Sequence, residues 1–169
     1  LYDAAGKEVT PEKPASITGL VNGESYAERI DTKMPGTVVY THDEYGNQTA
    51  SYTLGQWQDQ GTGKINNANG EIEGVWTEKK LDVATWKITY NWKGNVPSGK
   101  YEQTLPTDGN TYINGQQYIV DDKFKDGTTV ETTDIYGNVN GVYTFHGWNH
   151  QTGETITSNL TIEGTWSFE

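Results

Sequence analysis

The sequence predicts a mainly β protein of the β-rich α+β class, built from two tandem modules arranged end to end. Three observations support this prediction. Two motifs near the C-terminus each recur about 90 residues upstream. Residues typical of tight turns are frequent and include 20 glycines, which favours short elements joined by turns. Between the turns, β-branched and aromatic residues alternate with polar ones, as in the half-buried strands of antiparallel sheets. Each module should hold at most one short helix.

The repeat is visible in motifs that occur twice. Tyr52-Thr-Leu-Gly-Gln-Trp57 is matched by Tyr143-Thr-Phe-His-Gly-Trp148, and Glu71-Ile-Glu-Gly-Val-Trp76 is matched by Thr161-Ile-Glu-Gly-Thr-Trp166. Shorter matches lie at spacings of 90 to 92 residues, as small changes in loop length would produce; they include Asp43 with Asp134, Tyr45-Gly-Asn47 with Tyr136-Gly-Asn138, and Tyr26 with Tyr118.

The repeat sets the module boundaries. We predict a first module at residues 1–80 and a second at 83–169. The segment 78–82 reads Glu-Lys-Lys-Leu-Asp. It is short, charged and free of Gly and Pro, so we expect a junction that does not behave as a flexible linker.

In the first module, strand signals begin only after residue 36. Pro11 and Pro14 exclude regular helix or central strand near the start. The later elements are predicted, in chain order, as a short helix within 23–33, a strand at 37–41, a turn at Asp43–Asn47, a strand at 50–57, a loop at Gln58–Gly70 and a closing strand at Glu71–Thr77.

The second module opens with the clearest strand of the chain, Val83–Trp92. Its alternation puts Trp86, Ile88, Tyr90 and Trp92 on one face. The first module has no counterpart to this strand, so it is atypical or lacks its opening strand. Further elements are predicted as a small hairpin at 112–120, a strand at 128–133, a turn at Asn138–Gly141, a strand at 141–148 and a closing strand at 161–168.

The duplicated aromatic residues are predicted to fill two separate interiors. A glycine, Gly74 or Gly164, stands at the same inward place of both closing strands. A glycine within a strand lets a neighbouring side chain approach the strand backbone closely. We therefore predict that the tryptophan of the other repeated segment in each module packs on this glycine. The core signature consists of Trp57, Trp76, Trp148, Trp166, Tyr52, Tyr143 and Phe145.

The charge and the missing cysteines exclude several classes. The net charge is −11, and an acidic surface repels phosphate backbones and anionic lipids, so neither nucleic acid nor a membrane is an expected partner. The chain contains no cysteine, which excludes disulfides and Cys-based zinc sites. Apolar runs are too short for a membrane span, and no signal peptide is recognisable. Leu1 is not an initiator methionine, so we expect an excised fragment. We also expect the protein to be a monomer.

Catalytic and metal signatures are weak. His146 and His150 are four residues apart, a spacing that aligns two ligands on a helix but not across a strand end and a loop. They and His42 are better explained as solvated histidines. Asp121 and Asp122, with Asp126 and Asp134, could hold a calcium ion only weakly, because the spacing of a calcium loop is absent. We expect no enzyme, no metal and no cofactor.

Two tryptophans remain as candidates for ligand binding. Trp86 and Trp92 have no partners in the first module. They could cover the seam between the modules, and if either is exposed it becomes the leading candidate for stacking on a sugar ring.

The closing motifs resemble those of the SHIRT domains, tandem repeats of streptococcal cell-wall-anchored proteins. The resemblance is carried by Tyr143-Thr-Phe-His-Gly-Trp148, Leu160-Thr-Ile-Glu-Gly-Thr-Trp166 and Lys87-Ile-Thr-Tyr-Asn-Trp92. The closing signature is also similar to the Listeria–Bacteroides repeat of internalins. The opening Tyr2-Asp-Ala-Ala-Gly6 is similar to mucin-binding-protein repeats, which implies a β-grasp-like core.

The SHIRT resemblance implies a secreted, cell-wall-anchored protein of a Gram-positive bacterium. It implies a non-catalytic, rigid stalk that projects a distal ligand-binding domain, with neighbouring repeat modules of the same chain as its partners. The alternative is a carbohydrate- or mucin-binding adhesin module that recognises a host glycan or mucin, because an acidic module rich in Asn, Gln, Trp and Tyr also fits that class.

Overall fold

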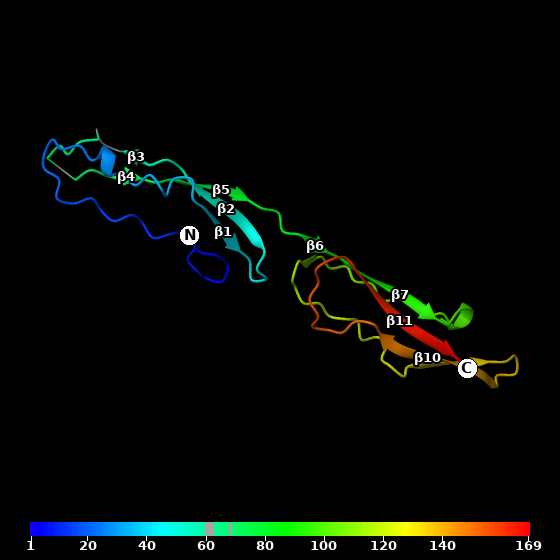
Figure 1. Cartoon of the computed structure of the whole chain (residues 1–169). Helices are drawn as coiled ribbons and strands as arrows, with labels where there is room; N and C mark the ends of the chain where they lie inside the picture. Colours follow the sequence, from blue (N-terminus) through cyan, green and yellow to red (C-terminus); the bar gives the residue numbers. More distant parts are fainter. Residues whose placement is uncertain (60–62, 68) are drawn as a thin grey trace. The chain divides into compact units, whose positions relative to one another are not determined.

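The structure is a computed structural model that describes residues 1–59, 63–67 and 69–169. The chain divides into two compact units, Leu1–Val83 and Ala84–Glu169, each of which is mainly β (Figure 1). The described residues contain two 3₁₀ turns, η1 (Ala27–Arg29) and η2 (Gly99–Tyr101), and no α-helix. In that described part, no helix is long and apolar enough to span a membrane.

The first unit contains a three-stranded antiparallel sheet and a short ladder. The sheet has the order β1-β2-β5, with β1 at Val38–His42, β2 at Gln48–Leu54 and β5 at Trp76–Lys80. The ladder pairs β3 (Gln58–Asp59) with β4 (Ile72–Glu73) in antiparallel orientation. β1, β2 and β4 overlap the predicted strands, β3 lies in the predicted loop at Gln58–Gly70, and β5 extends from the predicted closing strand into the predicted junction.

The second unit contains a four-stranded sheet and a second short ladder. The sheet has the order β7-β11-β10-β9, with β7 at Ile88–Gly94, β9 at Thr129–Thr133, β10 at Val139–Trp148 and β11 at Leu160–Phe168. The ladder pairs β6 (Thr85–Trp86) with β8 (Tyr112–Ile113).

The central hairpins of the two units have the same register. Val39 pairs with Tyr52 in the β1–β2 ladder, and Val130 pairs with Tyr143 in the β9–β10 ladder. Both ladders contain an irregularity next to the turn. The third strand repeats as well, since β2 pairs with β5 as β10 pairs with β11. The repeated motifs therefore occupy equivalent places in two separate sheets.

The hairpin turns are also the same. The side chain of Asp43 accepts hydrogen bonds from the Tyr45 and Asn47 N–H groups, both at 2.9 Å. Asp134 accepts from Tyr136 and Asn138 at 2.8 and 2.9 Å. The pKa of each of the two carboxyl groups is lowered below its usual value. The hydrogen bond from the Asn47 or Asn138 side chain lowers it most, and the bonds from the backbone N–H groups add to this effect. The Asp43–Asn47 turn is confirmed.

The prediction that each repeated tryptophan packs on a glycine is confirmed. A Cβ atom placed on Gly164 would lie 2.6 Å from Cζ3 of Trp148, and one on Gly74 would lie 2.5 Å from Cζ3 of Trp57. Each glycine thus provides a surface on which an indole ring lies close against the strand backbone.

The interior of the second unit is aromatic and consists of two adjoining clusters. One contains Ile88, Tyr118 and Ile162, and the other contains Phe145 and Trp166, which are 0% and 1% exposed. Trp148 contacts both clusters. Among the described residues of the first unit, the buried apolar ones are Tyr26, Ala50 and Leu54, and Trp57 and Trp76 are only half-buried.

The opening strand of the second unit differs from its prediction. Its alternation is confirmed, because Ile88 is buried and Tyr90 and Trp92 are half-buried, whereas Thr89 and Asn91 are exposed. The strand is interrupted at Lys87, however, whose N–H donates to the Asn159 side chain at 2.9 Å. The part after Lys87 pairs with β11 in parallel orientation. This pair was not predicted, because its crossover spans almost the whole unit.

Three local predictions are corrected. The expected hairpin at 112–120 does not form, since Tyr112–Ile113 pairs with β6 and Gln117 bridges Thr155. The helix expected within 23–33 is limited to η1. The turn of the second hairpin is at Asp134–Asn138, and Val139 already begins β10.

The predicted junction at 78–82 begins later than expected. β5 runs through Lys80, and the Leu81 N–H still donates to the Thr49 carbonyl at 2.9 Å. The charged side chains of 78–80 therefore belong to an exposed strand of the first sheet. In the loop predicted at Gln58–Gly70, residues 60–62 and 68 lie outside the described residues.

Candidate functional site

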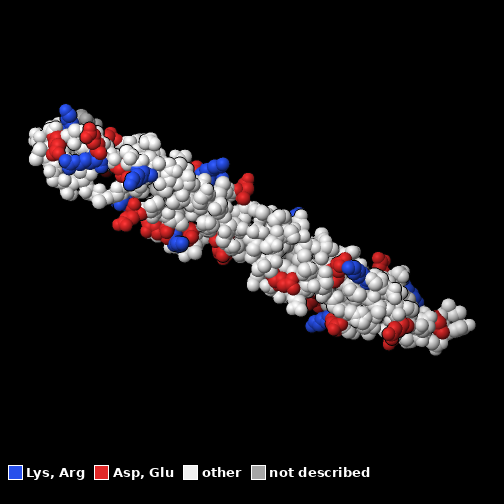
Figure 2. All heavy atoms as spheres, in the orientation of Figure 1, with Lys and Arg blue, Asp and Glu red and all other residues white. Residues whose placement is uncertain are grey.

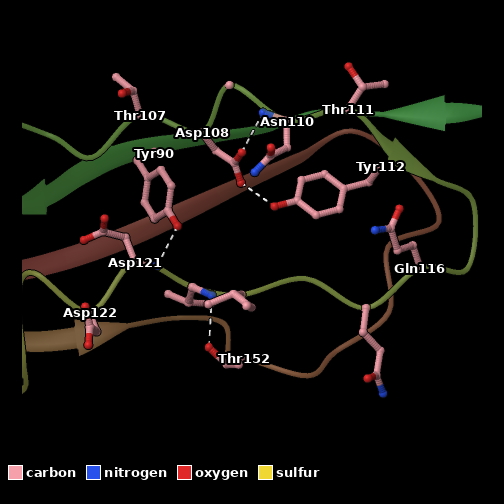
Figure 3. Close-up of a pocket in the computed structure, with 14 residues that line it drawn as sticks. Tyr90, Thr107, Asp108, Asn110, Thr111, Tyr112, Gln116, Asp121, Asp122 and Thr152 are labelled. Carbon is pink, nitrogen blue, oxygen red and sulfur yellow. Dashed lines mark hydrogen bonds between the residues drawn. The ribbon is translucent and has the colours of Figure 1, made fainter.

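A polar hollow of about 800 Å³ opens on the second unit (Figure 3). Tyr90 enters it from β7 and Tyr112 from β8. The remaining wall comes from three loops, at residues 107–111, 116–122 and around Thr152. Most of its side chains are hydroxyls, amides and carboxylates.

Asp108 organises one wall of the hollow. Its carboxylate accepts a hydrogen bond from the Tyr112 hydroxyl at 2.6 Å and one from the Asn110 N–H at 2.8 Å. The segment Asp108-Gly-Asn110 thus closes as a side-chain-bonded turn, which Asp and Asn favour. Burial, and then the hydrogen bond to Asp108, raise the pKa of Tyr112.

The opposite wall is fixed by hydroxyl groups that accept backbone hydrogen bonds. The Tyr90 hydroxyl accepts from the Asp121 N–H at 2.8 Å, and the Thr152 hydroxyl accepts from the Val120 N–H at 3.0 Å. Burial raises the pKa of Tyr90. The two tyrosine hydroxyls therefore stabilise the loops. The walls can hydrogen-bond a neutral polar ligand.

A second polar cluster of the second unit does not line the hollow. The buried Tyr118 hydroxyl donates to Glu154 at 2.7 Å, and Nδ1 of His150 lies 2.8 Å from the same carboxylate. The hydrogen bond from Tyr118, with that from His150, lowers the pKa of Glu154 to about 2. Burial, and then Glu154, raise the pKa of Tyr118.

The first unit holds the equivalent tyrosine in the same way. Tyr26 is 3% exposed, and its hydroxyl donates to Asp59 at 2.6 Å. The backbone contacts repeat too, since the Tyr26 N–H donates to Gly63 and the Tyr118 N–H to Glu154. The backbone hydrogen bond is equivalent in the two units, although the carboxylate that accepts from the hydroxyl stands at a different position in each. A buried tyrosine that is anchored at both ends in both units is best explained as a structural anchor. The Tyr26–Tyr118 match could have identified it from the sequence.

The two candidate ligand-binding tryptophans pack inside the second unit. Trp86 is half-buried against the Ile88 cluster, and its Nε1 donates to the Asn114 side chain at 3.0 Å. Trp92 stacks on Trp148 at 5.2 Å with an interplanar angle of 13° and makes edge contacts with further rings of the Phe145–Trp166 cluster. Neither ring is among the exposed large side chains of the described residues.

The seven residues of the predicted core signature fall into two groups. Phe145 and Trp166 are buried, whereas the half-buried ones are Tyr52, Trp57, Trp76, Tyr143 and Trp148. Tyr52 also donates its hydroxyl hydrogen bond to Glu78 at 2.7 Å.

The three histidines lie in different settings. His42 ends β1, Nε2 of His146 lies 2.7 Å from the Ser167 hydroxyl, and His150 belongs to the Tyr118 cluster. Two of the candidate calcium ligands have local roles: Asp134 closes its turn, and Asp121 accepts a hydrogen bond from the Lys123 N–H. In the described parts of the chain, no three potential ligands are grouped as a metal site would require.

Charged side chains are dispersed over the surface. Figure 2 shows Lys and Arg interspersed with Asp and Glu on the visible face of each unit, separated by uncharged residues. Dispersed charge of this kind supports solubility more than steering of a charged ligand.

Comparison with known proteins shows a similarity to a solved structure. Neither a family model nor a curated protein matches the sequence. Among solved structures, the chain is similar to streptococcal high identity repeats in tandem (SHIRT) domains 3-4 from a cell surface protein. The identity is 20%, the match covers 92% of this chain and 84% of that chain, and the TM-score is 0.36. The same family is the one that the closing motifs resemble, but at this identity and TM-score the structural likeness by itself assigns no function.

Proposed function

We propose that this chain is a non-catalytic tandem repeat of a bacterial cell-surface adhesin, and that it serves as a rigid stalk that projects a distal ligand-binding domain. The parent protein would be secreted and anchored in the cell wall, and the direct partners of each unit would be neighbouring repeats. The absence of cysteine fits a β protein of a Gram-positive surface that folds without disulfides.

One observation supports this proposal most strongly. The residues that the sequence repeats are those that build the hairpin, its turn and the indole–glycine contact in both units. The sequence repeats these interior contacts but repeats neither the hollow nor Trp86 and Trp92. Such a pattern is typical of a repeat array that was selected for its architecture.

The stalk proposal is tested by small-angle X-ray scattering of the 169-residue chain. A single compact globule of this length has a radius of gyration of about 15 Å. A stalk should give a clearly larger radius and a cross-section that matches one unit. A radius near the compact value, or a distribution that requires a hinged pair, would contradict the proposal.

The hollow supports a second candidate function, the binding of a host glycan or mucin. Its hydroxyl, amide and carboxylate groups suit the hydroxyls of a sugar, although its two tyrosines are already bonded within the fold. A glycan array separates the two functions, since a stalk gives no specific signal. If a glycan binds, Asp122→Ala in the hollow should abolish the signal, and Asp126→Ala outside it should not.

A further inference from the structure

Asparagine followed by glycine is prone to spontaneous deamidation, and the sequence contains four such steps: Asn22-Gly23, Asn69-Gly70, Asn114-Gly115 and Asn140-Gly141. Asparagine is chemically labile. Glycine has no side chain to hinder its backbone nitrogen, so this nitrogen can attack the carboxamide of the asparagine before it. The fold determines which of these steps can reach the geometry of the attack.

The glycine nitrogen is held in the same way in two of the steps, one in each unit. Asn22-Gly23 and Asn114-Gly115 are a repeated pair. In the first, the glycine N–H donates to the Ile65 carbonyl at 2.7 Å. In the second, the glycine N–H donates to the Ile156 carbonyl at 2.8 Å. A nitrogen held against a carbonyl must give up that hydrogen bond before it can attack the side chain of its own asparagine.

The carboxamide groups of the same two steps are held as well. Oδ1 of Asn22 accepts a hydrogen bond from the Asn67 N–H at 2.9 Å. Oδ1 of Asn114 accepts one from Nε1 of Trp86 at 3.0 Å. Both reacting groups would therefore have to leave their hydrogen bonds, and each loss is unfavourable. The attack is slow for as long as these turns are folded.

The step at Asn140-Gly141 is held within the second sheet. Gly141 is buried in β10 and pairs with Thr132 of β9. Oδ1 of Asn140 accepts a hydrogen bond from the Thr132 hydroxyl at 2.8 Å. The paired strand thus keeps the Gly141 nitrogen away from the carboxamide of the residue before it.

The step at Asn69-Gly70 has a different environment. Both residues are exposed and belong to no strand. Among the described residues, neither the Gly70 N–H nor the Asn69 side chain has a hydrogen-bond partner. The local structure therefore does not oppose the approach of the Gly70 nitrogen to Cγ of Asn69.

We propose that Asn69 is the principal site of spontaneous deamidation in this chain, and that the fold protects the other Asn-Gly steps. The Gly70 nitrogen loses its proton to solvent base and bonds to Cγ of Asn69. The bond from Cγ to the side-chain nitrogen then breaks, and this nitrogen takes up a proton from solvent and leaves as ammonia. The product is a succinimide.

Solvent water opens the succinimide at either of its two carbonyl carbons. Opening at Cγ leaves an aspartate at position 69. Opening at the main-chain carbonyl leaves an isoaspartate, in which the main chain runs through the former side chain. No reagent other than water and its acid and base forms is consumed.

The isoaspartate product should disturb the packing of the first unit. It adds a methylene group to the main chain directly before Gly70. A Cβ atom on Gly70 would lie 3.3 Å from the ring of Tyr26, so this backbone passes close to that ring. Tyr26 is 3% exposed, and its hydroxyl donates to Asp59 at 2.6 Å. The modification therefore acts on a buried tyrosine of the first unit and leaves the second unit unchanged.

The site is tested by prolonged incubation of the full chain in mildly alkaline buffer, followed by peptide mapping with mass spectrometry. In the folded chain, deamidation at Asn69 should be at least about tenfold faster than at the other Asn-Gly steps. In a parallel incubation in guanidinium chloride the protection is lost, and all of these steps should convert at similar rates. Similar rates in the folded chain, or no conversion at Asn69 under conditions where the unfolded chain converts, would overturn the proposal.

Two variants test the effect on the first unit. Asn69→Ser removes the reactive carboxamide, so the thermal stability of its first unit should not change during the incubation. The unsubstituted chain should lose stability in that unit as isoaspartate accumulates. Asn66→Ser is the matched control, because Asn66 is also exposed but precedes an asparagine in place of a glycine, and this variant should age as the unsubstituted chain does. Equal ageing of the two variants would contradict the assignment to Asn69.

Discussion

At the scale of single residues, the two glycines under the indole rings determine how closely each core can pack. Neither has the positive φ that would favour glycine for its backbone alone, so the cost of a side chain is steric. A Cβ on Gly164 would meet Trp148 and Phe145 at 2.6 and 2.7 Å, and one on Gly74 would meet Trp57 at 2.5 Å. Distances this short require the ring to move.

We therefore predict that Gly74→Ala and Gly164→Ala each destabilise their own unit by about 1–3 kcal/mol, the usual cost of overpacking. Urea denaturation followed by tryptophan fluorescence measures the change. Gly109→Ala is the matched control, because its Cβ would meet nothing within 4 Å, and it should be close to neutral. Equal effects at all three glycines would contradict the packing argument.

The Glu154 carboxylate gives the second unit a dependence on pH. The folded-state pKa of Glu154 is about 2, below its ordinary value of 4.5. A lowered folded pKa contributes stability that is present above pH 4.5 and is lost as the pH falls toward 2. Glu154→Gln should thus destabilise the second unit at about pH 6, and the difference from the unsubstituted chain should shrink steadily toward about pH 2.

Thermal unfolding at several pH values measures this difference. Comparison with the substituted chain is needed because Asp43 and Asp134 also have lowered pKa values and add their own loss of stability at low pH. The exposed Glu131 on β9 provides a Glu131→Gln control. A Glu154→Gln effect of the same size at about pH 6 and about pH 2.5 would refute the role of the ionised carboxylate.

At the scale of elements, β7 is an edge strand of the second sheet, and the side chains of its inward face cover the aromatic core. Trp92 stacks on Trp148 and makes edge contacts with Phe124, Phe145 and Trp166. Trp92→Ala should destabilise the second unit by about 3–5 kcal/mol, as deletion of a core aromatic ring does. Asn91→Ala, on the exposed face of the same strand, should have little effect. Calorimetry checks both, and similar losses for the two variants would disprove the assignment of faces.

The repeat allowed much of the strand layout to be predicted, and one error arose where it was not applied. The second hairpin was assigned a turn at Asn138–Gly141 on its local Asn-Gly-rich sequence, although Asp134 already matched Asp43 in the turn of the first module. The break at Lys87 depends on the Asn159 side chain, which is 72 residues away. No local periodicity contains that information.

The candidate site was less predictable than the strands. The hollow is built from loops whose walls meet only after folding, such as Asp121 with Tyr90 and Val120 with Thr152. Trp86 and Trp92 were candidates because they had no repeat partner. The missing repeat partners have a structural reason. Trp92 lies within β7 and Trp86 lies just before it, and β7 has no counterpart in the described part of the first unit.

At the scale of the whole molecule, the two interiors should unfold separately. Both apolar clusters of the second unit consist of its own residues, and the described part of the first unit lacks the strand that covers the equivalent core. We predict two calorimetric transitions, of which the first unit gives the lower. Gly74→Ala should shift the lower transition alone, and Gly164→Ala the upper one alone, because distant sites without shared partners act independently. A single transition whose calorimetric and van't Hoff enthalpies agree would mean one merged folding unit. A merged unit would be incompatible with a stalk assembled from separate repeats, so this measurement bears on the proposed function as directly as on stability.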